Sequence, residues 1–265
     1  MSGISIVSTT KSEWIKFRSV RSTLYNVITI FVLSIGLGAL ISFAAAHDYV
    51  AHPERQIDFE PLRFSLVGIF FAQFVVGVLG SMFITSEYST GTIRTTLAAV
   101  PRRTMMVIGK IIVMLASVFV ISELITFIAF LIGQAIFKAN RSGNVSVPNL
   151  TLSSPGALRG VIFAGLYLVL LAAIGFGLGL ILRKSVAAIV VFVVVLLVLP
   201  ILAALLPSSW GNPILRYLPS ELGRGMMSIN QASGTFSPTG SLLVLSLYAV
   251  ALVVGGAWLL NTRDA

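Results

Sequence analysis

The chain has 265 residues, of which 57% are hydrophobic and only 10% are charged, whereas an ordinary soluble domain carries about 25% charged residues. Its mean hydropathy of +0.99 is too high for a soluble fold, so most of the apolar excess is expected to face lipid. The net charge of +9 is spread in short clusters between apolar runs, which favours a role in membrane orientation over nucleic-acid binding.

Residues 1–23 are polar and basic and precede the first apolar run. Thr10 and Glu13 match the capping-box pattern Thr-x-x-Glu, which predicts a helix over residues 10–23. At 100° per residue, Trp14 and Phe17 share an apolar arc, with most of the cations outside it. We therefore predict a cytoplasmic amphipathic helix in the membrane interface, with a simple positively charged anchor as the alternative. The residues assigned to this interfacial helix are Trp14, Phe17, Arg18 and Arg21.

Six apolar runs are long enough to cross a membrane, because about 20 helical residues span about 30 Å of hydrocarbon. They predict an all-α integral membrane protein with one transmembrane domain over residues 24–265. The first run has 23 residues, more than the hydrophobic region of a signal peptide, so we expect a retained span. The predicted spans are residues 24–46, 64–84, 111–137, 160–182, 186–206 and 241–260.

The distribution of Lys and Arg predicts the orientation. Eleven of the 18 cations lie in residues 1–23, residues 85–110, residues 183–184 and at Arg263. Loops rich in Lys and Arg stay in the cytoplasm, so these segments and both termini are expected there.

Residues 85–110 carry both charge signs between the second and third spans. Glu87 is expected to open a short helix, Gly91 to bend it and Pro101 to end it. Such an element is suited to docking on another protein. A plain helical hairpin with cationic anchors is the alternative.

Glu123 is the one ionisable side chain deep in a predicted span. A charged group at that depth costs about 2.5–3.5 kcal/mol on insertion scales. Two explanations remain open: a contact with substrate or a proton, or a neutral acid that hydrogen-bonds to a neighbouring helix.

Small residues recur four apart in the first span, at Ser34, Gly38, Ser42 and Ala46, and in the fourth span at Gly175 and Gly179. Such strips let helix backbones approach closely, and we expect this packing within one subunit. Pro200 is expected to kink the fifth span or end its regular hydrogen bonding. Residues 207–240 hold four prolines and predict two short re-entrant or interfacial helices before the last span.

The motifs of several enzyme classes are absent. Gly109-Lys110 is followed by Ile111, so no G-x-x-x-x-G-K-[ST] phosphate loop occurs, and any ATP hydrolysis is expected in a partner. Both histidines lie outside the spans, which argues against haem ligation and intramembrane proteolysis. Without cysteine, disulfides, thiolate catalysis and cysteine-based zinc sites are excluded. We expect no enzymatic activity, cofactor or metal in this chain.

The run EYSTGTIRTTLAAVPRRTMMVIGK resembles the cytoplasmic coupling region of ABC transporter type 2 permeases, in which Glu-Tyr-x-x-Gly-Thr-x-Arg is followed by Pro-Arg-Arg and a Lys. The opening SEWIKFRSVRSTLYN resembles the interfacial helix of the same family. The six spans and the broken segment before the last one also match, so the resemblance covers nearly the whole chain. It implies the permease subunit of an ATP-driven exporter in the cytoplasmic (inner) membrane of a bacterium.

The resemblance also implies partners and residue roles. Two permease subunits, identical or different, would pair around a substrate path, and each would dock on a separate ATP-binding cassette subunit. In this family the first, second and fifth spans line the path, which places Gln73 and Pro200 beside it; Glu123 matches no family motif and is kept as a candidate. By position, the coupling element would comprise Glu87, Gly91, Thr92, Arg94, Pro101, Arg102 and Arg103.

Three functional classes follow. The first is the ABC exporter subunit, whose apolar walls favour an amphipathic, lipid-like or drug-like solute. The second is a self-contained proton-coupled secondary carrier that uses Glu123. The third is a membrane anchor or sensor that transports nothing. ATP dependence separates the first from the second, and any flux separates both from the third.

Overall fold

A computed structural model of the chain describes residues 6–19, 21–52, 59–92, 103–142, 145–230 and 234–262. Within these ranges the chain is helical except for its connections and one short antiparallel hairpin, formed by β1 (Arg141–Ser142) and β2 (Val145–Ser146). Six helices are long and apolar enough to cross a membrane. The predicted class, an all-α integral membrane protein, is therefore confirmed.

Each predicted span overlaps one of the six membrane-length helices, although the second helix, Ile69–Ser89, begins five residues after the predicted start. The first joins α2 (Arg21–Phe31), the π-helical η1 (Val32–Leu37) and α3 (Gly38–Ala51). The fifth joins α9 (Ser185–Val193), the π-helical η3 (Val194–Val198) and α10 (Leu199–Ala204). The remaining elements are α1 (Ile6–Ser19), α4 (Pro61–Ser65), α5 (Ile69–Ser89), α7 (Arg103–Ala139), α8 (Ala157–Leu182), α11 (Ser208–Leu215), α12 (Pro219–Met227) and α13 (Pro238–Thr262).

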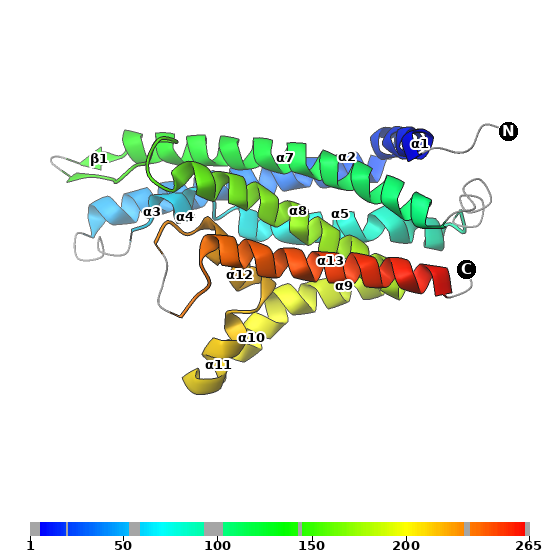
Figure 1. The fold of residues 1–265 in the computed structure, drawn as a ribbon. Coiled ribbons are helices and arrows are strands. Elements are labelled where there is room, and N and C mark those ends of the chain that lie inside the picture. The colour runs from blue at the N-terminus through cyan, green and yellow to red at the C-terminus, as the bar shows by residue number, and fades with distance from the viewer. Residues whose placement is uncertain are drawn as a thin grey trace.

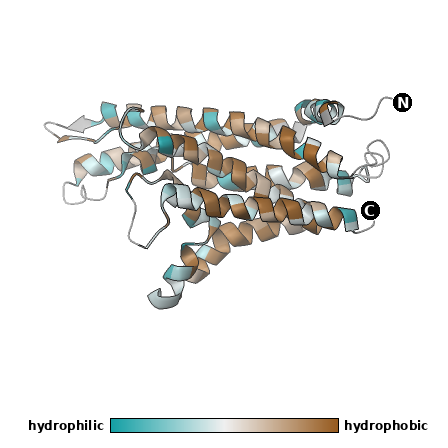
Figure 2. Ribbon diagram, viewed as in Figure 1, coloured by the Kyte–Doolittle hydropathy of each residue, from teal (hydrophilic) through white to brown (hydrophobic). Residues whose placement is uncertain are grey.

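The helix α8 lies at the centre of the bundle and packs against α5, α7 and α13 (Figure 1). The spans run side by side, whereas α1 is seen nearly end-on in this view and therefore lies across them. The end of α5, the start of α7, α1 and the last turn of α13 gather at one end of the bundle, and the β1–β2 hairpin lies at the other. Apolar residues fill the middle of the helices and polar residues gather towards the ends (Figure 2).

Small residues set the spacing between α5 and α8. A Cβ atom added at Gly175 would lie 2.4 Å from the carbonyl oxygen of Gly77, and one at Gly80 would lie 2.2 Å from that of Ala172. Both distances are far below van der Waals contact, so only glycine permits this approach. The fourth-span strip is thus packed within the subunit, as the sequence predicts.

The strip of the first span also packs inside the subunit. Ser34, Gly38, Ser42 and Ala46 are all buried. The hydroxyl of Ser42 donates a hydrogen bond of 3.1 Å to the carbonyl oxygen of Phe64, next to the break between α4 and α5.

The fifth span leaves α-helical geometry where proline occurs. Pro200 lies in the first turn of α10, directly after the π-helical turn η3. The proline ring removes a backbone N–H donor and crowds the preceding turn, so the regular α-helical hydrogen bonding is interrupted there. Two short helices, α11 and α12, then occupy part of the predicted segment 207–240. Of these, α12 packs against α8 and α13.

Candidate coupling site

The first helix begins at Ile6, four residues before the predicted cap. Thr10 therefore lies inside α1, and the capping-box interpretation is wrong. The buried face of α1 carries Thr9, Glu13 and Phe17 at intervals of four, and α1 packs on α7. The Glu13 carboxylate does not cap the start of the helix, because it forms ion pairs with Lys16 and Lys110.

The aromatic residues of α1 divide between two environments. The side chain of Trp14 is 48% exposed, which is consistent with the predicted membrane-facing surface, and Arg18 is exposed as well. Phe17 is buried instead, with its ring centroid 5.8 Å from that of Phe83 in α5. The predicted apolar arc is thus divided between two surroundings, because α5 and α7 cover the Phe17 side of the helix. Arg21 begins α2, and its side chain lies outside the described part of the structure.

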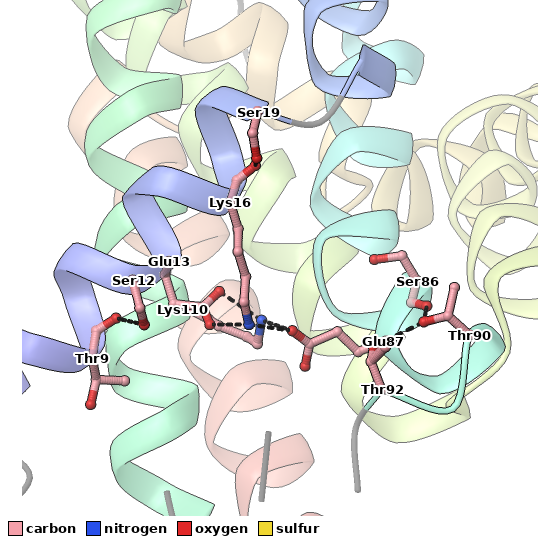
Figure 3. Close-up of polar contacts among 10 residues, drawn as sticks. All are labelled: Thr9, Ser12, Glu13, Lys16, Ser19, Ser86, Glu87, Thr90, Thr92 and Lys110. Atoms are coloured by element: carbon pink, nitrogen blue, oxygen red, sulfur yellow. Dashed lines mark hydrogen bonds and ion pairs between the residues drawn. The ribbon is translucent and has the colours of Figure 1, made fainter. Parts of the chain in front are cut away.

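Four charged residues meet where α1, α5 and α7 converge (Figure 3). The Lys110 ammonium in α7 lies 2.7 Å from Glu13 Oε2 and 2.6 Å from Glu87 Oε1. Lys16 reaches the same carboxylates, at 3.0 Å from Glu13 Oε1 and 3.1 Å from Glu87 Oε1. These residues, Glu13, Lys16, Glu87 and Lys110, are called the lysine–glutamate cluster below.

The lysine–glutamate cluster has two residues of each charge sign, of which Glu13, Glu87 and Lys110 are buried and Lys16 is exposed. Lys110 is 1% exposed and its ammonium lies 5.7 Å from the centroid of the Phe83 ring. A buried ammonium is stable only when partners replace its water, and two carboxylates do so here. At Lys16, partial burial acts to lower the pKa, but the hydrogen bonds and negative charges of Glu13 and Glu87 outweigh it, so the pKa is raised above its ordinary value.

A glycine next to the cluster makes room for α1. A Cβ atom added at Gly109 would lie 2.8 Å from the Thr9 methyl carbon. Thr9 is β-branched and buried, so it has little freedom to move aside. On this turn of α7, Gly109 allows α1 to approach closely, and Lys110 forms an ion pair with Glu13 of α1.

Glu87 does not open a helix after the second span. It lies in the last turn of α5, which ends at Ser89, because ion pairs with Lys16 and Lys110 keep the carboxylate inside the fold. Gly91 then adopts a left-handed conformation with φ of 70°, a conformation typical of helix ends. The hydroxyls of Thr92 and Thr90 are 2.9 Å apart.

The remaining coupling residues are only partly described. Arg94, Pro101 and Arg102 lie outside the described residues, and the side chain of Arg103, the first residue of α7, does so too. The described residues nonetheless place both flanks of this segment, α5 and α7, on the same ion cluster. A force applied between residues 92 and 103 would therefore act on α1, α5 and α7 together.

The candidate path residues occupy separate environments. Gln73 is buried between α5 and α8, where its side-chain oxygen accepts a hydrogen bond from Tyr167 and its amide donates one of 2.8 Å to the carbonyl of Phe70. Both carboxyl oxygens of Glu123 are buried and have no hydrogen-bond partner among the described residues. Pro200 is half-buried in α10.

Glu123 lies against a glycine of the central helix. A Cβ atom added at Gly165 would lie 2.4 Å from Glu123 Oε1. The Glu123 carboxyl therefore occupies the space that a side chain at position 165 would need. Among the described residues, the Glu123 carboxyl forms no hydrogen bond to a neighbouring helix, which was one of the two expectations. It instead packs against α8 at Gly165, which has no side chain.

Sequence reasoning missed the lysine–glutamate cluster as a unit. A usable signal was present in Glu13, which stands four residues before Phe17 and so shares a helix face with an aromatic ring. A second signal was Lys110, an isolated cation that follows a glycine at the start of a long apolar run. Neither signal reveals its partner, because the partners are 97 and 23 residues away from Lys110.

Residues 40–265 match the family described as Protein of unknown function (DUF2705), so the chain belongs to this family. The match includes Glu87, Lys110 and Glu123, and begins after α1. No curated protein matches the sequence.

Proposed function

We propose that this chain, a member of the DUF2705 family, is the membrane-spanning permease subunit of an ATP-driven ABC exporter in a bacterial cytoplasmic membrane. Both termini would lie in the cytoplasm. The subunit would pair with a second permease, identical or different, and dock on a separate ATP-binding cassette subunit through residues 90–103. Its solute would be amphipathic, lipid-like or drug-like.

The observation that carries this proposal is the lysine–glutamate cluster. Residues 87–110 carry the resemblance to a coupling element, and the two helices that contain its ends, α5 and α7, form ion pairs with each other and with α1. Closure of an ATPase pressing on this segment would move α1, α5 and α7 as one body, because separating them would expose unpaired charges. The arrangement suits a subunit that receives mechanical work from a partner.

The first test is the composition of the native complex. The full-length protein is extracted from its native membrane in mild detergent, and every co-purifying chain is identified and quantified. A roughly equimolar soluble subunit with a G-x-x-x-x-G-K-[ST] loop supports the proposal. Repeated recovery of intact protein without such a subunit contradicts it.

The second test separates coupling from folding. Arg94→Glu reverses a charge in the docking segment and is expected to uncouple ATP-dependent transport at unchanged expression and thermal stability. Lys138→Glu makes the same change at the opposite end of α7, where Lys138 is exposed, and is expected to transport normally. Normal ATP-dependent transport by Arg94→Glu would count against the coupling assignment.

A second candidate, a proton-coupled secondary carrier, is favoured by the unpartnered buried carboxyl of Glu123. A carrier needs a carboxyl whose proton can be exchanged, and a group held by ion pairs serves this less well. In this case transport follows a proton gradient without ATP, and Glu123→Gln abolishes it at normal expression. Under the exporter proposal, transport by the wild type and by Glu123→Gln depends on ATP and not on a proton gradient. Absence of flux under either driving force would instead identify an anchor or sensor subunit.

A further inference from the structure

A pocket of about 840 Å³ opens at the end of the bundle opposite α1, between α4, the start of α5 and α12. Its volume lies within the range of small-molecule sites, about 300–1,000 Å³. It is far larger than a single inorganic ion requires. This space is called the distal pocket, and its argument rests on Arg63, Phe70, Arg216, Arg224, Met227 and Phe236.

The walls of the distal pocket are largely apolar and aromatic. The ring of Phe70 comes from α5, the thioether of Met227 from the end of α12, and the ring of Phe236 from the segment before α13. Rings and a flexible thioether form a surface that fits an acyl chain or an aromatic body.

Three arginines and two glutamates, Glu60 and Glu221, border this surface, and the arginines differ in their partners. Arg224 is neutralised by Glu221, with 2.5 Å between Nη1 and Oε1. Arg216 lies over the Tyr217 and Phe236 rings, at 4.8 Å and 5.9 Å from the centroids. Among the described residues, neither Arg63 nor Arg216 has a carboxylate partner. Two guanidinium groups therefore remain able to bind an oxyanion in bidentate geometry.

We propose that the distal pocket binds an amphipathic anion, with its apolar body along Phe70, Met227 and Phe236 and its phosphate or carboxylate group on Arg63 and Arg216. The site requires no ATPase partner, so it goes beyond the proposed export function and holds under the carrier alternative as well. Membrane phospholipid and a free single-chain amphiphile share this chemistry, and the experiment distinguishes them.

The test uses the purified full-length chain in neutral maltoside detergent with dodecyl phosphate as the probe. Saturable binding, measured as a thermal shift at fixed detergent excess, is expected for dodecyl phosphate. Inorganic phosphate and dodecyltrimethylammonium are expected to bind much more weakly, because the first lacks the apolar body and the second has the wrong charge. Equal binding of either compound would overturn the proposal.

The variants assign the site to its residues. Arg63→Gln and Arg216→Gln are each expected to weaken dodecyl phosphate binding by about tenfold or more, since each removes a charge-assisted contact. Lys138→Gln removes the same charge at the same end of the bundle outside the pocket lining and is expected to bind as wild type. Phe236→Ala tests the apolar wall. It is expected to weaken the binding of dodecyl phosphate and to leave the binding of inorganic phosphate unchanged. Equal weakening by Lys138→Gln, or no weakening by both arginine variants, would overturn the proposal.

Folding and the source of the ligand are checked separately. Arg63→Lys and Arg216→Lys keep the charge and lose the bidentate fork, so they give intermediate affinity even where a glutamine variant fails to fold. Wild-type affinity in both would overturn the proposed recognition. Competition by nanodiscs containing phosphatidic acid, and not by phosphatidylcholine alone, supports a membrane lipid as the occupant. Binding of dodecyl phosphate without such competition supports a free single-chain amphiphile.

Discussion

Buried glutamates occur in two regions of this protein, and their surroundings differ. Glu13 and Glu87 share the ammonium groups of Lys16 and Lys110 at distances of 2.6–3.1 Å. Both carboxyl oxygens of Glu123 are buried without a hydrogen-bond partner among the described residues. Each region also has a glycine that makes room, Gly109 against α1 and Gly165 against Glu123.

The two environments suit the two regions to different roles. A cluster of matched charges is costly to open, since separating the partners leaves charges without water or counter-charge. It therefore suits a joint that holds three helices in a fixed relation. A carboxyl without a partner has no ion pair to break, so a proton or solute that reaches it displaces no counter-charge. The first property fits a subunit driven by a partner, and the second fits a carrier.

The largest effect is expected from Lys110→Met, which leaves Glu13 and Glu87 with only the half-exposed Lys16. We expect the free energy of unfolding to fall by about 3–5 kcal/mol, because a buried ion pair loses one side. It is measured by detergent-driven unfolding of the purified protein. The control Lys138→Met changes an exposed lysine at the far end of α7 and should cost less than about 0.5 kcal/mol.

A triple variant sharpens this result. Replacing Glu13 and Glu87 by glutamine together with Lys110→Met removes the three buried charges of the lysine–glutamate cluster at once. Most of the lost stability should return, because no buried charge of the cluster is then left unpaired and the remaining Lys16, 47% exposed, reaches water. A triple variant as unstable as Lys110→Met alone would show that packing, and not charge, is lost.

Two glycines of α8 give the next largest effect. Gly175→Ala brings a Cβ within 2.4 Å of the carbonyl oxygen of Gly77, which is backbone, and we expect a loss of about 1–3 kcal/mol. Gly165→Ala meets the end of the Glu123 side chain instead, so we expect a smaller loss. Gly255→Ala faces open space in α13 and should leave unfolding unchanged or raise its free energy slightly. Equal losses at Gly165 and Gly175 would show that Glu123 is rigidly held.

A still smaller effect is expected from Glu123→Gln. The side chain keeps its shape and has no described partner to lose, so the free energy of unfolding should change by less than about 1 kcal/mol. The measurement is the same detergent-driven unfolding. A loss comparable to that of Lys110→Met would erase the contrast between the two regions, and would place a partner of Glu123 outside the described residues.

The sequence predicted the fold better than the site. The length of the six apolar runs predicted six membrane-spanning helices, and the glycines at positions 175 and 179 predicted close approach of another helix. The structure confirms both predictions. The short helices before the last span were expected because proline marks their boundaries. Such features depend on residues within one or two turns of each other.

The lysine–glutamate cluster depends on distant residues. Glu13 matched a capping box, and Glu87 stood where a new helix was expected, because local rules assign a glutamate near an apolar run to a helix start. Their true partners lie on α7, and only the tertiary fold brings that helix to α1 and α5. Likewise, Phe17 is buried because other helices cover that side of α1. The periodicity of residues in α1 alone cannot reveal which helix packs there.

The smallest effect concerns the exposed edge of the cluster, and it is read through pH. The pKa of Lys16 is raised above its ordinary value of 10.5 in the folded protein. A lysine with a raised folded-state pKa stabilises the fold below its unfolded-state pKa, and this contribution disappears as the pH rises through the folded-state pKa. The stability difference between wild type and Lys16→Gln is expected to be about 0.2–1 kcal/mol, because the Lys16 side chain is 47% exposed. It should be constant below about pH 10 and fall away as the pH rises through the folded-state pKa, which lies above 10.5. Lys11→Gln, on the exposed face of α1, should show no such step, and a Lys16 difference that persists at high pH would mean that its packing and not its charge closes the cluster.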